Sequence, residues 1–166
     1  MVQHQLRRYN VTTPNAALTL QFNHPVIELL WTVQRQKFSE KAGLFNYAGV
    51  RGKDPLEHAL LQLNSQPRFG GSDIPGNYYR LVQPYQAHSC IPDSFVYVWS
   101  FALFPEDACS PSGSINMSRI DSVILNLDLD AALFAAANET ITVTVMATNW
   151  QLGRLRDGLF GVAYSS

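Results

Sequence analysis

The chain of 166 residues has few charges and few cysteines, and it lacks a long apolar run. Only 15% of its residues are charged, where about 25% is typical of soluble domains. With a net charge of -1 and scattered basic residues, the chain shows no basic patch of the kind that binds nucleic acid. So few charges also solvate a surface poorly, and we therefore expect large contacts with other chains.

Cysteine and membrane signals are equally sparse. Cys90 and Cys109 are too few for a disulfide framework and lack metal-ligand spacing, which favours two free thiols in a reducing compartment. The longest apolar run, residues 95–104, is interrupted by Ser100 and is far shorter than the ~20 residues of a spanning helix. Residues 1–10 have no apolar core of the signal-peptide type. We expect a soluble protein made without a signal in this chain.

Motifs of enzymes and metalloproteins are missing as well. The histidines are His4, His24, His58 and His88. They lie far apart and form none of the closely spaced motifs that bind metals. Asp128 and Asp130 share one face of a predicted strand and are expected to be solubilising groups, because a glycosidase places its two carboxylates across a cleft. The nucleophile and phosphate-loop motifs are absent too, so we expect no metal, no cofactor and no catalytic residue.

What the sequence does contain is a period of two in its apolar residues, the pattern of strands with one buried face. The alternation is strictest over residues 123–130 and 140–147. Residues 95–103 are apolar on both faces, which predicts a central strand covered on both sides. The other predicted strands are residues 17–22, 26–34 and 58–64, with an irregular terminal strand at 155–164.

Helix is predicted in only two short turns. Residues 78–85 carry apolar side chains at helical spacing, but Pro84 is expected to end any helix near Val82. Residues 130–137 are rich in alanine, and Asp130 is the predicted N-cap of a second turn.

Many strands joined by glycine- and proline-rich loops indicate an all-β protein, an antiparallel eight-stranded jelly-roll sandwich. About seven strands are recognisable, so we expect the jelly roll to be incomplete. An unpaired sheet edge invites association, and the isolated chain is therefore expected not to be a stable monomer.

The segment Pro-Ser-Gly-Ser-Ile-Asn-Met-Ser-Arg-Ile-Asp, residues 111–121, is interpreted as a rigid corner of the sandwich. Pro111 fits the second position of a turn, and Gly113 can take backbone angles that other residues avoid. Asn116 is expected to tie the loop backbone together.

The same corner ends in an arginine and an aspartate. Arg119 lies between Met117 and Ile120, so its guanidinium is expected to be partly buried and in need of acceptors. Asp121, two residues further on, is its nearest expected partner. We interpret the pair as structural and not as a reactive centre.

Two surface functions remain open. Asn10, Asn116 and Asn138 lie in glycosylation sequons, which are chance matches more often than used sites in a chain without a secretory signal. An aromatic platform for sugars would need exposed rings, but Trp31 and Trp99 lie on apolar strand faces and are expected in the core.

The corner also carries a resemblance. FVYVWSFALFPEDACSPSGSINMSRID, residues 95–121, resembles a signature of the major capsid proteins of large icosahedral DNA viruses, the iridovirus and algal-virus type. Further similar segments are FNHPVIELLWTVQ (22–34), LQLNSQPRF (61–69), YYRLVQPYQAHSCIP (78–92) and TNWQLGRLRDGLFGVAYSS (148–166). The similarity is collinear from about residue 18 to the end, with departures at Ser65, Ala87 and Trp150 that affect loop details.

The resemblance implies a double jelly-roll protein that assembles as trimeric, pseudo-hexagonal capsomers of a virion. A chain of this length corresponds to most of the second, C-terminal jelly roll, as one domain over 1–166 with 1–17 as an N-terminal extension or linker. Implied partners are two further copies, neighbouring capsomers and minor capsid proteins, without direct nucleic-acid contact or membrane insertion. The rival hypothesis is a carbohydrate-binding β-sandwich module, and an enzyme on a jelly-roll scaffold comes third.

Overall fold

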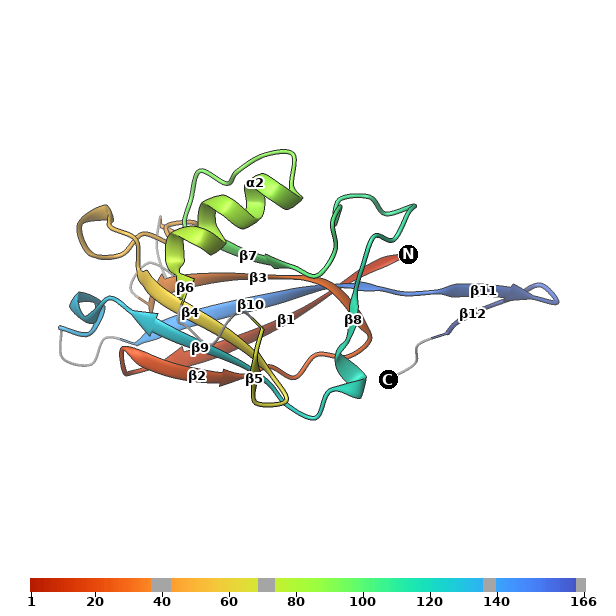
Figure 1. Ribbon diagram of the computed structural model, residues 1–166, viewed down its shortest axis with the longest axis horizontal. Helices are drawn as coiled ribbons and strands as arrows, with labels where there is room; N and C mark the ends of the chain where they lie inside the picture. The colour runs from red at the N-terminus through yellow and green to blue at the C-terminus, as the bar shows by residue number, and fades with distance from the viewer. Residues whose placement is uncertain (37–42, 69–73, 136–139, 164–166) are drawn as a thin grey trace.

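The structure is a computed structural model that describes residues 1–36, 43–68, 74–135 and 140–163. Two antiparallel sheets form a sandwich (Figure 1). Sheet A has the strand order β1 (Val2–Val11), β10 (Ile141–Trp150), β3 (Pro25–Arg35) and β7 (Val96–Ser100), with β8 (Ile115–Asn116) also paired to β3. Sheet B has the order β2 (Asn15–Thr19), β9 (Val123–Leu129), β4 (Leu56–Leu63) and β5 (Gln66–Pro67), with β6 (Ile74–Pro75) paired to β4.

Each sheet path contains four strands, which together make the eight strands of a jelly roll. The predicted all-β, antiparallel jelly-roll class is therefore confirmed. The expectation of a missing strand is wrong, because β1 completes sheet A. The remaining elements are the helical segments η1 (Val50–Gly52), η2 (Tyr78–Val82), α2 (Gln83–Ala87), η3 (Met117–Arg119) and η4 (Ala131–Phe134) and the hairpin strands β11 (Gly153–Arg156) and β12 (Leu159–Val162).

Alternating apolar residues place the core between the two sheets. Leu125 and Leu127 of β9 and Val143 and Val145 of β10 are all almost fully buried, and the residues between them are half-exposed. The period-two pattern therefore predicted both the strands and the faces that they bury.

The N-terminal residues form a full strand and no linker. β1 pairs with β10 along its whole length, from Val2 opposite Trp150 to Val11 opposite Ile141. The assignment of residues 1–17 to an extension or linker is wrong. Strand β1 escaped prediction because its apolar residues do not alternate, and long-range pairing with β10 decides its conformation.

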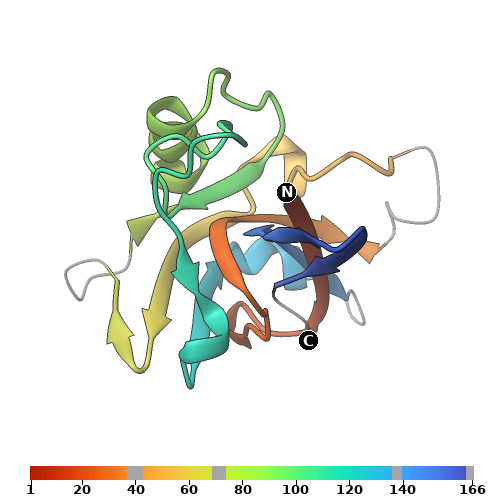
Figure 2. The same cartoon turned by 90° about the vertical axis from the view of Figure 1, so that its right-hand side faces the viewer.

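Strand β7 is buried, but it is not central. It lies at the end of the sheet A order, next to β3 alone, and Val98 on its second face is 1% exposed. The helical segments η2 and α2 lie along this edge (Figures 1 and 2). The backbone N–H of Ser100 donates to Oε1 of Gln83 at 3.2 Å. A helix, and not another strand, therefore covers the edge of the sheet.

Helical structure runs from Tyr78 through Ala87, past the residue that was expected to end it. The chain widens into a π-helical turn ahead of Pro84, which then occupies the first turn of α2, where a proline ring is tolerated. The second predicted turn is confirmed as η4, where the Asp130 carboxylate accepts from the N–H of Ala132 at 2.9 Å. In the described part of the chain, no helix is long and apolar enough to cross a membrane.

The C-terminal segment is a hairpin and not one irregular strand. Asp157 and Gly158 have φ angles of 52° and 78° and join β11 to β12 through a two-residue turn. Asp-Gly between alternating strands is a strong local signal for this turn. The hairpin projects away from the sandwich, beyond the N-terminus (Figure 1).

Four aromatic side chains meet where the two sheets and the helix come together. The ring of Tyr79 on η2 lies edge-on to Trp31 at 5.1 Å and tilted against Trp99 at 6.1 Å. Tyr97 stacks on Trp31 at 5.8 Å, and the Tyr79 hydroxyl donates to the carbonyl of Ala59 in sheet B at 3.1 Å. The expectation that Trp31 and Trp99 belong to the core is confirmed. These rings join sheet A, sheet B and the helix into one core.

A polar contact closes the same side of the sandwich. The Tyr97 hydroxyl donates to the Asp54 carboxylate, whose second oxygen lies 3.3 Å from Nη1 of Arg80. The Arg80 guanidinium also lies 4.2 Å from the ring centre of Phe95. Burial is the main cause that raises the pKa of Tyr97, so its hydroxyl stays protonated and remains a donor.

Replacing Tyr79 tests this core. We expect Tyr79→Ala to lower the free energy of unfolding by about 3–5 kcal/mol, because it removes a ring that is 1% exposed. Tyr79→Phe should cost about 1–3 kcal/mol, because it leaves the Ala59 carbonyl without its donor. Urea titration followed by fluorescence measures both values. Tyr85, which is 77% exposed, provides the matched controls Tyr85→Ala and Tyr85→Phe, and equal losses at both positions would contradict the role of Tyr79.

Candidate functional site

The predicted corner ties together segments that are distant in sequence. The Asn116 side chain accepts from the N–H of Ser118 at 3.1 Å, and the Ser118 hydroxyl accepts from the N–H of His24 at 2.9 Å. Gly113 has a φ of +155°, and a Cβ built on it would lie 2.6 Å from the carbonyl oxygen of Phe101. The close approach of two backbones therefore requires glycine here.

The corner differs from its prediction at the charged pair. Arg119 and Asp121 are both exposed, and no ion pair joins these two described residues. The expected burial of Arg119 is wrong because η3 turns Met117 toward the core, where it is 3% exposed, and leaves Arg119 in water. Pro111 is exposed and lies outside any turn, while a turn forms at 104–107. The interpretation as a structural corner then depends on Gly113 and Asn116.

A second site, on the outer face of sheet A, is a polar network that runs from the buried Glu28 through the half-buried His88 to the exposed Glu106. The carboxylate of Glu28 on β3 is 10% exposed and accepts from the Thr148 hydroxyl at 3.1 Å. Its other oxygen lies 2.9 Å from Nε2 of His88, just past α2. Nδ1 of His88 lies 3.2 Å from the Glu106 carboxylate. Both ring nitrogens face carboxylate oxygens, so the geometry favours the doubly protonated imidazolium.

The contacts within this polar network shift two pKa values in opposite directions. The hydrogen bond to Glu28 is the main cause that raises the pKa of His88, against an opposing effect of burial. Glu106 also accepts from the backbone N–H and the hydroxyl of Ser89, both at 3.1 Å. The backbone hydrogen bond from Ser89 is the main cause that lowers the pKa of Glu106. Together these contacts attach two loops to sheet A.

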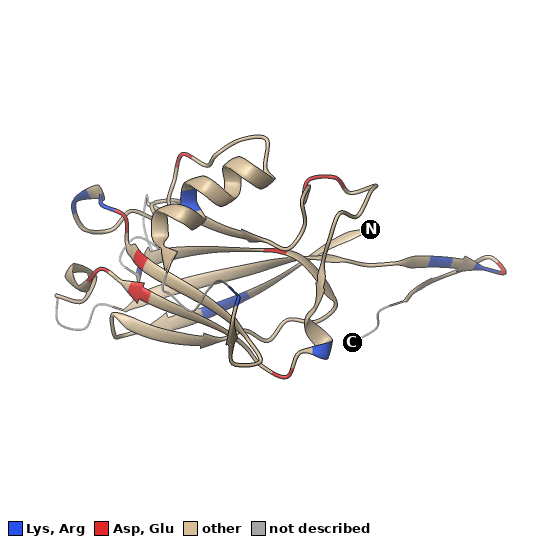
Figure 3. Ribbon diagram, in the orientation of Figure 1, with Lys and Arg blue, Asp and Glu red and all other residues tan. Residues whose placement is uncertain are grey.

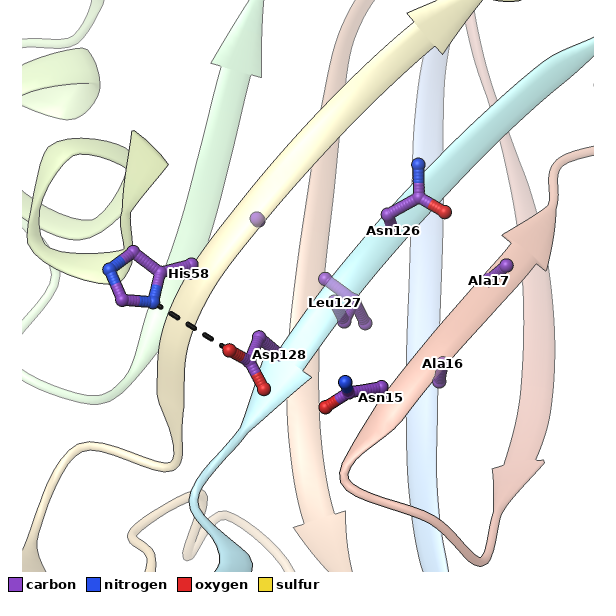
Figure 4. Close-up of a pocket in the computed structure, with 8 residues that line it drawn as sticks. Asn15, Ala16, Ala17, His58, Asn126, Leu127 and Asp128 are labelled. Atoms are coloured by element: carbon purple, nitrogen blue, oxygen red, sulfur yellow. Dashed lines mark ion pairs between the residues drawn. The ribbon is translucent and has the colours of Figure 1, made fainter. Parts of the chain in front are cut away.

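A third arrangement lies on the outer face of sheet B, where Asn15, Asp128 and His58 line up across β2, β9 and β4 (Figure 4). Nδ1 of His58 lies 3.8 Å from the Asp128 carboxylate, and a register shift at Leu56 and His58 places Glu57 beside them. One ligand atom from each of Glu57, His58 and Asp128 lies within 4.8 Å of the others. These donors are types that bind zinc, but water reaches all of them, and exposed pairs stabilise a fold little.

The sequence did not indicate this juxtaposition, because the three residues lie on two strands that are paired only in the fold. Asp128 behaves as the predicted half-exposed carboxylate of β9, and Asp130 caps η4. The pocket that His58 and Asp128 border, about 260 Å³, is otherwise lined mainly by alanine and asparagine.

An apolar row crosses the outer face of sheet A. Leu6, Met146, Leu30 and Val98 lie in register on β1, β10, β3 and β7. Leu6 at one end is 48% exposed, and Val98 at the other end is 1% exposed and lies on β7, which contacts η2 and α2. The flanking rows are polar and contain threonines. A sheet face with such a row is suited to packing against another protein surface.

The other predicted features lie as follows. Cys90 and Cys109 are free and exposed. Asn10 is exposed on β1, and Asn116 is half-buried with its side chain engaged in the corner. Asn138 lies outside the described residues. Of these residues, only Asn116 belongs to one of the sites above, the corner.

The aromatic residues that would support a sugar platform are mostly internal. Trp31, Tyr79 and Trp99 are 1%, 1% and 6% exposed. Tyr78 and Trp150 are half-buried. The carbohydrate-binding alternative therefore loses the rings on which it depended.

The glycine of the corner can be tested directly. We expect Gly113→Ala to lower the free energy of unfolding by about 1–3 kcal/mol, because its Cβ would push Phe101 away. Arg119→Ala should change it by no more than about 0.5 kcal/mol, as for an exposed side chain without buried partners. Thermal unfolding of both variants checks this contrast, and a larger loss for Arg119→Ala would reverse the assignment.

The polar network of Glu28, His88 and Glu106 predicts that the stability of the fold depends on pH. Since the folded-state pKa of His88 is raised, its contribution to stability is complete below the unfolded-state pKa of about 6.5 and is lost as the pH rises through the folded-state pKa. The lowered pKa of Glu106 acts in the opposite sense, and its contribution to stability is lost in acid, as the pH falls below the ordinary glutamate pKa of 4.5 and through the lowered folded-state pKa.

We therefore expect stability to decline above neutral pH in the wild type and to decline less in His88→Gln. Urea midpoints measured from pH 5 to pH 9 test this expectation, with His58→Gln as the matched control on the other sheet. If His88→Gln keeps the wild-type slope, the imidazolium of His88 is not the cause.

Comparisons with known proteins agree on one family. The model of the large eukaryotic DNA virus major capsid protein matches residues 1–161. The major capsid protein of Phaeocystis pouchetii virus is 47% identical over 115 residues, which cover 69% of this chain and 21% of that protein. The major capsid protein of Pyramimonas orientalis virus is 34% identical over 186 aligned positions, which cover 98% of this chain and 42% of that protein.

A solved structure gives the same result. The chain is similar to the capsid protein in a quasi-atomic model of the PBCV-1 virus capsid, with a TM-score of 0.78 and 25% identity. The similarity covers 99% of this chain and 51% of that one. The chain thus spans about half of the solved capsid protein and less than half of the two curated relatives. From this sequence match and this shared fold it follows that the chain belongs to the family of large eukaryotic DNA virus major capsid proteins.

Proposed function

We propose that this chain is the jelly-roll part of a structural capsid subunit, which associates with other copies in the icosahedral shell of a large DNA virus. The observation that carries the proposal is the likeness to the PBCV-1 virus capsid, which extends over 99% of the chain and includes both sheets. Its place is the virion, and its role is mechanical and not catalytic.

The finer proposal is a trimeric, pseudo-hexagonal capsomer built from double jelly rolls. The chain accounts for 51% of the PBCV-1 capsid chain, which is the share expected of one jelly roll out of two. The half-exposed apolar row of sheet A supports this proposal, because a second jelly roll or a second subunit would remove that row from water. Neighbouring capsomers and minor capsid proteins are the further proposed partners.

The low charge of the chain fits such a role. With 15% charged residues, its faces lose little solvation when they pack against protein. An apolar row that ends in an exposed leucine on one sheet, bordered by threonines, has the composition of an interface with an apolar centre and a polar rim.

Particle imaging tests this proposal. We expect negative-stain images and mass photometry of the purified protein to show trimers with a threefold outline. Leu6→Glu should weaken the trimer roughly tenfold or more, because it introduces a charge at an apolar contact. Leu81→Glu is the matched control, since Leu81 is 42% exposed and lies on the helix, away from the row. A protein that stays monomeric at every concentration would contradict the proposed capsomer.

A further inference from the structure

One imidazole and two carboxylates converge on the outer face of sheet B. Glu57, His58 and Asp128 each offer one ligand atom, and these three atoms lie within 4.8 Å of one another. The first two residues come from the start of β4 and the third from the end of β9, where Figure 3 shows acidic segments. Imidazole nitrogens and carboxylate oxygens are both ligands of divalent transition metals. We call these three residues the β4–β9 cluster.

A β-bulge brings two successive residues of β4 to the same face. The register of β4 against β9 shifts between Leu56 and His58, so Glu57 is the extra residue of the longer strand. Leu56 and Ala59 are 3% and 2% exposed and belong to the core, which leaves both residues between them on the outer face. In a regular strand, neighbours alternate, and Glu57 and His58 would lie on opposite faces. The bulge therefore assembles the cluster.

The three side chains are close together but are not hydrogen-bonded to one another. Nδ1 of His58 lies 3.8 Å from the Asp128 carboxylate, which is too long for a hydrogen bond (Figure 4). Within the described chain, no hydrogen bond engages the side chain of any cluster residue. Two ligands of one zinc ion, each ~2.0–2.1 Å from the metal, lie ~3.3 Å apart in a tetrahedral site. Since the side chains of His58 and Asp128 are 46% and 43% exposed, small rotations bring their ligand atoms to that spacing.

The histidine beside sheet A shows the opposite arrangement. His88 also lies between two carboxylates, but its Nε2 is 2.9 Å from Glu28 and its Nδ1 is 3.2 Å from Glu106. Both distances are those of hydrogen bonds. The two carboxylates contact different ring nitrogens, which point away from each other, so one ion cannot bind the ring and both carboxylates. His58 differs because its neighbouring carboxylates lie on the same side and leave its nitrogen available to a metal.

The cluster has no cationic partner on its own sheet. The strands of sheet B, all of which the structure describes, contain no lysine or arginine. Glu57 and Asp128 therefore place two negative charges on neighbouring strands, and like charges at such positions destabilise a sheet. A divalent cation between the two carboxylates offsets this repulsion.

We propose that Glu57, His58 and Asp128 bind one zinc ion on the outer face of sheet B, with water as the fourth ligand. Zinc accepts nitrogen and oxygen ligands, and three protein side chains with one water are a common zinc coordination. Magnesium and calcium take oxygen ligands, so the imidazole selects against them. The pocket of about 260 Å³ that His58 and Asp128 border provides space for the water.

The ion connects β4 to β9 where the bulge interrupts their pairing. The proposal departs from the expectation of no metal, which depended on how closely the histidines are spaced along the sequence. That spacing does not reveal a bulge or the partner strand. The site is independent of the proposed capsid function, because it involves one chain only, so either proposal can fail without the other.

Zinc titration of the tag-free protein tests the site. Isothermal titration calorimetry should show one zinc ion per chain and no binding of magnesium. Glu57→Gln, His58→Ala and Asp128→Asn should each weaken zinc binding at least tenfold, because each removes a ligand. His88→Gln and Asp130→Asn are the matched controls and should keep the wild-type affinity. No zinc binding by the wild type, or an unchanged affinity in His58→Ala, would overturn the proposal.

The exposed thiols are the competing zinc ligands. Cys90 and Cys109 are free and exposed, and thiolates bind zinc. The titration is therefore repeated with Cys90→Ser/Cys109→Ser, in which zinc binding should be unchanged. Cobalt in place of zinc should give visible absorption bands without the charge-transfer band of a thiolate ligand. Loss of binding in the double serine variant would assign the zinc to the thiols and reject the β4–β9 cluster.

Thermal unfolding provides an independent readout. Excess zinc should raise the melting temperature of the wild type, because an ion that binds only the folded chain stabilises it, and a chelator should reverse the increase. Asp130→Asn should show the same increase and His58→Ala should show none, while circular dichroism confirms that both variants are folded. The increase should also disappear in acid, where protons compete for the ligands. An equal increase in His58→Ala would place the zinc elsewhere on the chain and reject the site.

Discussion

The packing of Tyr79 between Trp31 and Trp99 is the contact on which the rest of the fold depends. A jelly roll has an open side where the last strands of its two sheets diverge. Here a helix closes that side, and Tyr79 reaches from the helix to both sheets through ring contacts with sheet A and a hydrogen bond to Ala59 in sheet B. Because the helix is held there, β7 can end its sheet without exposing an apolar edge.

This closed core determines which surfaces remain for partners. The helix covers one end of the apolar row of sheet A and leaves Leu6 at the other end in water. The hairpin of β11 and β12 projects from the end of the sandwich opposite to the start of β4, where Glu57 and His58 lie (Figure 1). A sheet face with an exposed apolar row is suited to packing against another protein surface, as the proposed capsid function requires.

The polar groups serve the same architecture by fixing loops. His88 connects the end of α2 to Glu28 of sheet A and to Glu106 of the next loop, and the corner at Asn116 and Ser118 fixes the turn before β3. Loops held in this way present constant surfaces, which suits the repeating shell that we propose. The raised pKa of His88 depends on contacts that form only in the folded chain. The stability of these loops therefore depends on pH.

The sequence by itself determined the strands with alternating apolar residues, the burial of Trp31 and Trp99, the cap at Asp130 and the family, because these depend on local periodicity or on long collinear motifs. The Asp157-Gly158 turn was also a local signal, although it was not recognised. Only the tertiary structure decided that β1 is a strand, that β7 lies at an edge, that Arg119 is exposed and that His58 faces Asp128. Each of these depends on which distant segments pair and in which register, and one residue of register moves a side chain to the opposite face.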